Sequence, residues 1–310
     1  MFEGVLGIKK PTFGLDVGYQ TLKVVQVKGR GRGTHLIGAA EVPIPAGMLN
    51  KDGVRDKKKL AQAITQAIQA AKPHRISAQF VSSALPESLV FTKSLDLPKM
   101  TPAEINKNIP NQATEFFPIP PQDTYMDWQI VGQYPTNNTI EVLVVAAPKV
   151  LVNALVETVK LAGLELMGLE TKPSSLVRAL IPPGNLEPTI ILDIGAKISG
   201  LTCFDQQTIK LTSTVAVGGD EIKKDFDTAI KALATEIMHL VKYYQNRIGQ
   251  AQVFKKVVLA GGGANIKNVP ETLTDLTKIQ TALGTPWANL KTYDPRFATA
   301  LGLAMKDIND

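Results

Sequence analysis

One short pattern occurs twice in this chain and constrains its fold more than any other feature. An apolar run ending in Leu-Asp-x-Gly appears as TFGLDVGYQT (12–21) and again as TIILDIGAKI (189–198). A single strand that ends at an Asp-x-Gly turn is ordinary, because Asp and Gly favour turns. Two such stretches in matching context predict a duplicated fold.

The hydrophobic patterns around the two copies also repeat. The strands expected in the first half are 13–17, 22–27, 35–44 and 78–82, with a helix over 57–71. Those expected in the second half are 190–193, 199–204, 208–215 and KVVLAGGG (256–263), with a long helix from 219 to about 248 and further helices from 270 and 295. Each half therefore has three strands, a helix and a strand.

The composition narrows the class of protein. At 310 residues the chain has room for about two domains. It has no apolar run of membrane-spanning length, and its start does not look like a secretory signal. Cys203 is the only cysteine, so we expect a buried thiol in a reducing cytoplasm. The net charge of +6 comes partly from KGRGRG and RDKKK, which lack interleaved aromatics, so nucleic acid is not an expected partner.

The segment 85–168 has no counterpart in the second half. It contains strand-like runs, a capped helix near TPAEINKN and the proline cluster FFPIPPQ. We expect an inserted lobe that forms a groove where it meets the first domain. The candidate groove residues are Leu89, Phe91, Phe116, Phe117 and Trp128. The expected division is 11–84, the lobe 85–168, a linking segment and helix 169–185, and 186–310.

An Asp-x-Gly hairpin suits phosphate binding, because glycine lets the backbone approach a ligand and successive N–H groups face it. Asp16 and Asp193 would repel phosphate directly but could hold Mg²⁺ through water. Two more glycine-rich turns could border the same ligand. The residues expected to contact it are Asp16, Gly18, Tyr19, Gln20, Thr21, Lys23, Asp193, Gly195, Ala196, Lys197, Ser199, Gly218, Gly219, Asp220, Gly261, Gly262, Gly263 and Ala264.

The order of these turns resembles the actin-like ATPase superfamily, and within it the PilM family of type IV pilus assembly. The matching stretches are FGLDVGYQTLKVVQV and ILDIGAKISGL (the two phosphate hairpins), VAVGGDEI, LAGGGANIKNVPETL (the adenosine motif) and RFATALGLAMKDI. The resemblance implies an α/β actin-like ATPase fold of two related ribonuclease H-like domains. The first carries a small inserted α+β lobe, and the lobe of the second is reduced or missing.

The same resemblance implies a function. ATP and Mg²⁺ are the implied cofactors, and the implied partner is the cytoplasmic N-terminal peptide of the membrane protein PilN. Other pilus platform or motor ATPase proteins, self-association and a related type II secretion role are further expectations. The protein would be cytoplasmic, without direct membrane insertion.

Hydrolysis is expected to be weak or absent. In GLETKPSS, Glu170 or Lys172 stands where many actin-like ATPases orient the attacking water, and lysine has no acceptor for that task. Glu170 and Asp193 are the catalytic candidates. The alternatives are an active ATPase or filament former of the cell-division type and a sugar kinase, although no carboxylate is clearly placed to deprotonate a sugar hydroxyl.

Overall fold

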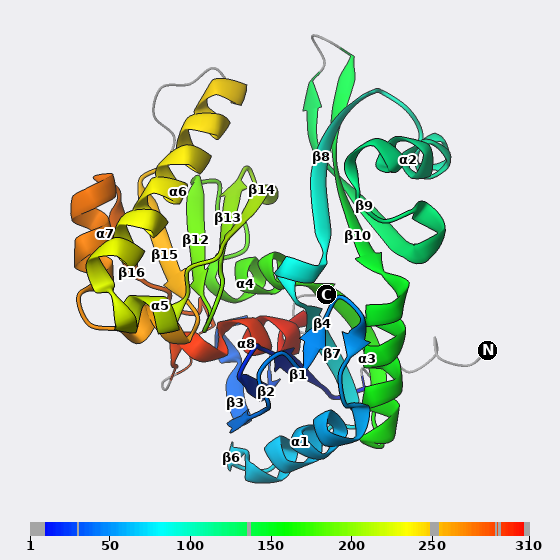
Figure 1. The fold of residues 1–310 in the computed structure, drawn as a ribbon, viewed down its shortest axis with the longest axis vertical. Helices are drawn as coiled ribbons and strands as arrows, with labels where there is room; N and C mark the ends of the chain where they lie inside the picture. Colours follow the sequence, from blue (N-terminus) through cyan, green and yellow to red (C-terminus); the bar gives the residue numbers. More distant parts are fainter. Residues whose placement is uncertain are drawn as a thin grey trace.

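The computed structural model describes residues 10–29, 31–134, 138–248, 254–288, 290 and 293–306. Three parts surround a central cleft (Figure 1). The first domain lies at the bottom of this view, the second domain at the left and an inserted lobe at the upper right. The two domains meet through a pair of short helices below the cleft.

The first domain is built on a six-stranded sheet. Its order is β11 (Glu165–Thr171), β7 (Phe80–Leu85), β1 (Thr12–Val17), β2 (Thr21–Lys28), β3 (His35–Pro43) and β6 (Lys72–Pro73). Helices α1 (Lys57–Ala70) and α3 (Lys149–Leu161) pack together beside this sheet. The Asp56 side chain caps α1 by accepting a 3.0 Å hydrogen bond from the Lys59 N–H. A short ribbon of β4 (Leu49–Asn50) and β5 (Gly53–Val54) adjoins α3.

The second domain repeats this strand order. Its sheet runs β14 (Thr208–Val215), β13 (Ser199–Asp205), β12 (Thr189–Ile194), β15 (Lys256–Ala260) and β16 (Gln280–Leu283). In each sheet the first strand of the hairpin pairs antiparallel with the second and parallel with a later strand. The duplicated fold is therefore confirmed. Cys203 is fully buried in this sheet, as expected.

The long helix of the second domain is interrupted, contrary to the prediction of one helix from 219 to 248. Helix α5 (Gly219–Lys224) ends before Asp225, whose backbone is extended, and α6 (Phe226–Ile248) begins immediately afterwards. The Asp225 side chain accepts a 3.2 Å hydrogen bond from the Thr228 N–H, which starts the new helix. Because only one residue separates the two helices, no second lobe is inserted here. Helix α7 (Val269–Thr277) packs against α6.

Two helices join the domains. Helix α4 (Lys172–Leu180) follows the last strand of the first sheet, and α8 (Ala298–Ala304), with the short turn η5 (Pro295–Phe297), follows that of the second. They pack on each other between the sheets, in a core that includes Leu176, Ala179 and Leu301. A Cβ on Gly302 would overlap the Ser175 carbonyl, so the crossing requires glycine there.

The inserted lobe is smaller than the sequence predicted. Its sheet has the order β8 (Phe91–Pro98), β10 (Thr139–Pro148) and β9 (Thr124–Tyr134), covered by α2 (Pro102–Phe116), with the turn η3 (Pro121–Asp123) in the proline cluster. Residues 149–168, expected in the lobe, instead form α3 and most of β11, and β11 pairs parallel with β7 of the first sheet. The expected boundary 85–168 is wrong at its end because this pairing joins segments far apart in the chain.

The lobe also contacts the second domain. Arg247 of α6 lies 2.8 Å from the Asp96 carboxylate and 3.1 Å from that of Glu141, both on lobe strands. The Ser94 hydroxyl donates a 3.3 Å hydrogen bond to the Lys210 carbonyl of β14. The lobe therefore bridges both domains.

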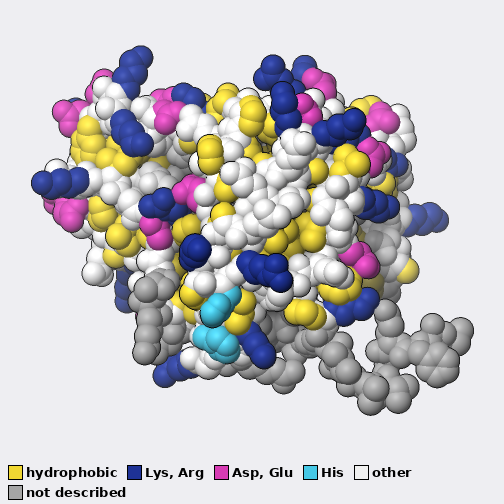
Figure 2. Space-filling view, turned by 90° about the horizontal axis from the view of Figure 1, so that it is seen from below, with side chains coloured by type: hydrophobic (Ala, Val, Ile, Leu, Met, Phe, Trp, Pro, Cys, Tyr) yellow, Lys and Arg dark blue, Asp and Glu magenta, His cyan; other side chains and the backbone are white. Residues whose placement is uncertain are grey.

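The surface shows no segregation of charge on the face seen in Figure 2, where lysine and arginine side chains are spread among acidic and hydrophobic ones. Within the described ranges, none of the helices combines the length and apolar character needed to cross a membrane.

Candidate functional site

The two Asp-x-Gly turns have the same backbone geometry. In the first, the Gly18 N–H donates to the Thr21 carbonyl at 2.9 Å, and in the second the Gly195 N–H donates to the Ile198 carbonyl at 3.1 Å. Both turns line one cavity of about 750 Å³ between the domains. The fold thus brings together hairpins that lie in different halves of the sequence.

Most of the residues expected at this site line the cavity. They are Asp16, Gly18, Tyr19, Gln20, Thr21, Lys23, Asp193, Gly195, Ala196, Lys197, Gly219, Asp220, Gly261, Gly262 and Gly263. Three others are not in the lining. The Ser199 hydroxyl is buried and donates to the Val217 carbonyl at 2.6 Å, Gly218 packs against the Ala196 backbone, and Ala264 lies in the core of the second domain.

The tips of both hairpins reach the same carboxylate across the cleft. Gln20 Nε2 of the first hairpin donates to Asp220 Oδ2 at 2.8 Å. Lys197 Nζ of the second lies 3.2 Å from the same Asp220 oxygen and 3.4 Å from Glu221 Oε1. Asp220 therefore connects the two halves at the rim of the cavity.

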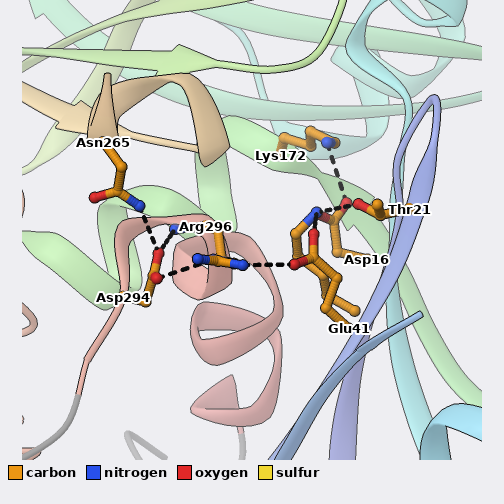
Figure 3. A network of polar contacts seen from close by, with 8 residues as sticks. Asp16, Thr21, Glu41, Lys172, Asn265, Asp294 and Arg296 are labelled. Carbon is orange, nitrogen blue, oxygen red and sulfur yellow. Dashed lines mark hydrogen bonds and ion pairs between the residues drawn. The ribbon is translucent and has the colours of Figure 1, made fainter. Parts of the chain in front are cut away.

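A buried ion pair forms the floor of the cavity (Figure 3). Lys172, the first residue of α4, places Nζ 3.1 Å from Asp16 Oδ1, and the two side chains are only 18% and 6% exposed. Burial alone would raise the pKa of Asp16, but the ammonium groups of Lys172 and Lys23 lower it below its ordinary value. Burial would lower the pKa of Lys172, but Asp16, Asp193 and Glu87 raise it. Both partners therefore stay charged.

Two further carboxyl groups share this floor. Burial raises the pKa of Asp193 above its ordinary value, and the charge of Asp16 raises it further. Burial, followed by the charge of Asp193, raises the pKa of Glu87 to about 8. Glu87 Oε1 is buried, and none of the described residues forms a hydrogen bond with it. Glu87 therefore carries a proton at neutral pH.

A polar chain extends from this floor to the second domain (Figure 3). Lys23 Nζ donates to Thr21 Oγ1 at 2.7 Å and lies 3.3 Å from Glu41, which in turn pairs with Arg296 at 2.9 Å. The guanidinium of Arg296 also pairs with Asp294, which accepts a hydrogen bond from Asn265 Nδ2, each at 2.9 Å. The chain links β2 and β3 to the turns before α8 and after β15.

Sequence reasoning did not place Glu87, Glu41 or Arg296 in this site. One signal could have located the basic residues. Lys172 precedes Pro173 and Arg296 follows Pro295, so each stands at the start of the helix that follows the last strand of its domain. Both side chains line the cavity.

The triple-glycine turn lies behind Asp193. Gly261 has φ +82°, a left-handed conformation that favours glycine, and a Cβ there would overlap Asp193 Oδ1 and the Ile194 carbonyl. The short 3-10 turn η4 (Gly262–Asn265) follows. Glycine at 261 thus allows β15 to turn away against the second hairpin.

The donor set does not suit the expected Mg²⁺. A divalent cation held by Asp16 and Asp193 would lie beside the Lys172 ammonium, and two unit charges of like sign about 4 Å apart repel by about 4 kcal/mol at an effective dielectric constant near 20. Among the described residues, no group of three or more His, Cys, Asp or Glu side chains could hold a metal ion.

Glu170 lies outside the cavity lining. Its carboxylate accepts hydrogen bonds from Arg178 at 2.5 and 2.8 Å, so it is held in a bidentate ion pair beside α4. This arrangement leaves it poorly placed to orient water in the cleft.

Two domains of equal strand order, an inserted lobe and facing Asp-x-Gly hairpins define an actin-like ATPase fold. A family model described as type IV pilus assembly protein PilM matches residues 14–230, and the chain belongs to this family. It is therefore an actin-like protein of type IV pilus assembly. A second family model, cell division protein FtsA, matches residues 190–302.

Relatives and solved structures agree with this fold. The cell division protein FtsA of Streptococcus pneumoniae serotype 2 (strain D39 / NCTC 7466) is 24% identical over 241 residues, 70% of this chain and 52% of FtsA. The chain thus spans about half the length of the curated relatives it matches. The structure of a PilM-PilN type IV pilus biogenesis complex matches with a TM-score of 0.81 at 22% identity, covering 97% of this chain and 99% of the other. MreB5 of Spiroplasma citri bound to AMPPNP matches with a TM-score of 0.53 at 12% identity, covering 96% of each chain.

Proposed function

We propose that this protein is a cytoplasmic adaptor of the type IV pilus platform that holds ATP in its cleft and binds the N-terminal cytoplasmic peptide of PilN. The observation that carries the nucleotide part is the convergence of both hairpins and the Gly261–Gly263 turn on one cavity of about 750 Å³. This volume lies within the roughly 300–1,000 Å³ of ordinary small-molecule pockets. Attachment to the membrane would be peripheral, through the partner.

The cavity offers donors that suit a triphosphate. The glycine-rich turns expose backbone N–H groups, and the side chains of Thr21, Lys172 and Lys197 add a hydroxyl and two ammonium groups. Hydrolysis would be weak, because Lys172 stands near the position expected to orient water and Glu170 is engaged by Arg178. The site therefore supports ATP as a ligand more strongly than as a substrate.

The peptide would bind along the inserted lobe. Of the five predicted groove residues, Phe116 is the most accessible, at 45% exposed, and Lys93 Nζ lies 5.5 Å from its ring. Phe117 is buried and packs on Phe91, with ring centroids 6.1 Å apart. Leu89 and Trp128 are partly buried, and Trp128 Nε1 donates to Asn106 Oδ1 at 2.6 Å. Phe116 is thus the best candidate for an apolar anchor.

Equilibrium binding of a fluorescent ATP analogue tests the nucleotide part. Wild type should bind it, and Asp16→Ala and Asp193→Ala should each weaken binding because they disturb the floor under both hairpins. Asp275→Ala, at an exposed position of α7, is the matched control and should bind as wild type does. If wild type shows no binding at millimolar analogue, ATP is not a ligand of this cleft.

Titration with a labelled PilN N-terminal peptide tests the partner. Phe116→Ala should weaken binding by roughly tenfold, the effect of losing an apolar anchor of ~1.5 kcal/mol. Leu276→Ala removes a comparably exposed apolar side chain from the second domain and should leave the affinity unchanged. Equal effects of the two variants would place the peptide elsewhere.

A further inference from the structure

Lys172 is held in place by its own backbone segment. It is the first residue of α4, and Pro173 directly after it occupies a position where proline fits the first turn of a helix. The hydroxyls of Thr171 and Ser174 form a 3.0 Å hydrogen bond across it, and Ser175 Oγ donates to the Lys172 carbonyl at 2.8 Å. The direction of its side chain into the cleft is therefore set by local structure.

The ammonium of Lys172 meets acidic groups from three other elements. Asp16 comes from the first hairpin, Asp193 from the second, and Glu87 from the turn η2 (Glu87–Leu89) after β7. Because Glu87 is protonated at neutral pH, Lys172 faces two ionised or ionisable aspartates with a single positive charge. In a site that binds a metal–triphosphate complex, a divalent cation would balance such a pair.

An ammonium group can serve a triphosphate in the same way. It has three N–H donors, of which one is directed at Asp16, so the others can turn toward phosphate oxygens. Lys172 lines the cavity together with Lys23 and Lys197, so three lysines face the space in which the phosphates would lie.

We infer that Lys172 takes the place of the divalent cation, so that this cleft binds a nucleoside triphosphate without Mg²⁺. The inference rests on the proposed function, because it presumes that a nucleotide binds here. It adds the ionic form of the ligand and the residue that determines it. It also replaces the sequence expectation that Asp16 and Asp193 hold Mg²⁺.

The test compares affinities for a fluorescent ATP analogue in excess EDTA and in excess MgCl₂. Wild type should bind with the same affinity in both, within about threefold. Lys172→Met should weaken binding in EDTA by about tenfold to a hundredfold, the loss of a charged hydrogen bond, and MgCl₂ should restore part of it because the aspartates become free to hold the metal. Lys197→Met, the control on the second hairpin, should weaken binding equally in both solutions.

Each other result overturns the inference in a recognisable way. If wild type binds in MgCl₂ but loses tenfold or more in EDTA, the inference is wrong while nucleotide binding stands. If wild type binds in neither solution, both the inference and the ATP proposal are wrong. If Lys172→Met behaves like Lys197→Met, Lys172 is an ordinary phosphate contact. The wild-type comparison needs no variant, so it decides the question even if Lys172→Met does not fold.

Discussion

The hairpin of the first domain and that of the second share a backbone but differ at the position opposite the aspartate. Lys23 lies opposite Asp16, whereas Gly200 lies opposite Asp193. A Cβ on Gly200 would overlap the Glu87 carboxyl group, so a side chain of the first domain fills this space. As a result, the pKa of Asp16 is lowered and that of Asp193 is raised. The duplication fixed the geometry of the turns, and the paired position set their charge.

Replacement of each aspartate by asparagine should separate the two hairpins most clearly. Asp16→Asn removes the nearest counter-charge of buried Lys172 and should lower the free energy of unfolding by about 3 kcal/mol. Asp193→Asn removes a carboxyl group whose ionised form is already disfavoured, so the loss should stay below about 1 kcal/mol. Urea denaturation at neutral pH measures both. Equal losses would show that the two aspartates have the same environment.

The glycines behind the second hairpin offer the next test. Gly261→Ala places a Cβ against Asp193 and Ile194 in a left-handed backbone conformation and should lower the free energy of unfolding by about 2–3 kcal/mol. Gly262→Ala introduces a Cβ into open space and should change it by less than about 0.5 kcal/mol. The same denaturation experiment compares them, and a tolerated Gly261→Ala would contradict this close approach.

The pH dependence of stability should reveal Glu87. Its pKa is about 8 in the folded protein and about 4.5 for an ordinary glutamate, so the folded state holds a proton that the unfolded chain releases. Its contribution to stability is complete below about pH 4.5 and is lost as the pH rises through 8. From roughly pH 5 to pH 7 the loss should be about 2 kcal/mol.

Denaturation of wild type and Glu87→Gln over this pH range measures that contribution. The variant should show a flatter profile, because glutamine does not titrate. Glu115→Gln, at an exposed position near the end of α2, should keep the wild-type slope. A Glu87→Gln profile parallel to wild type would mean that the Glu87 carboxyl group is not protonated in the folded state.

The smallest effect is expected at the rim. Gln20→Ala removes the hydrogen bond to Asp220 that crosses the cleft and should lower the free energy of unfolding by about 0.5–1 kcal/mol. Lys197→Ala removes a more exposed ion pair to the same residue, and its smaller effect should disappear in high salt. Denaturation at low and high salt distinguishes them. A salt-sensitive loss for Gln20→Ala would contradict a neutral donor at that tip.

The sequence could predict the hairpins because their signals are local. The expected strands 13–17 and 22–27 and the helix 57–71 differ from β1, β2 and α1 by no more than one residue at either end. Apolar periodicity and turn residues act over a few positions, and both are legible in one sequence. The actin-like fold and the PilM family followed from the order of these signals.

The floor of the site could not be predicted in the same way. Glu87 and Lys172 reach Asp193 and Asp16 from a turn and a helix that only tertiary packing brings to the hairpins. For the same reason β11 was assigned to the lobe, since its partner β7 lies far away in the chain. The break at Asp225 is local but was masked by the apolar spacing that continues on both sides of it.

The crossing of α4 and α8 has a consequence for the width of the cleft. These helices are the direct packing contact between the two sheets, and Gly302 brings them so close that their axes have little room to separate. Any opening of the domains must therefore rotate one helix against the other. Because Lys172 begins α4, such a rotation displaces its ammonium from Asp16, so the gap between the domains and the electrostatic balance at its base would change together.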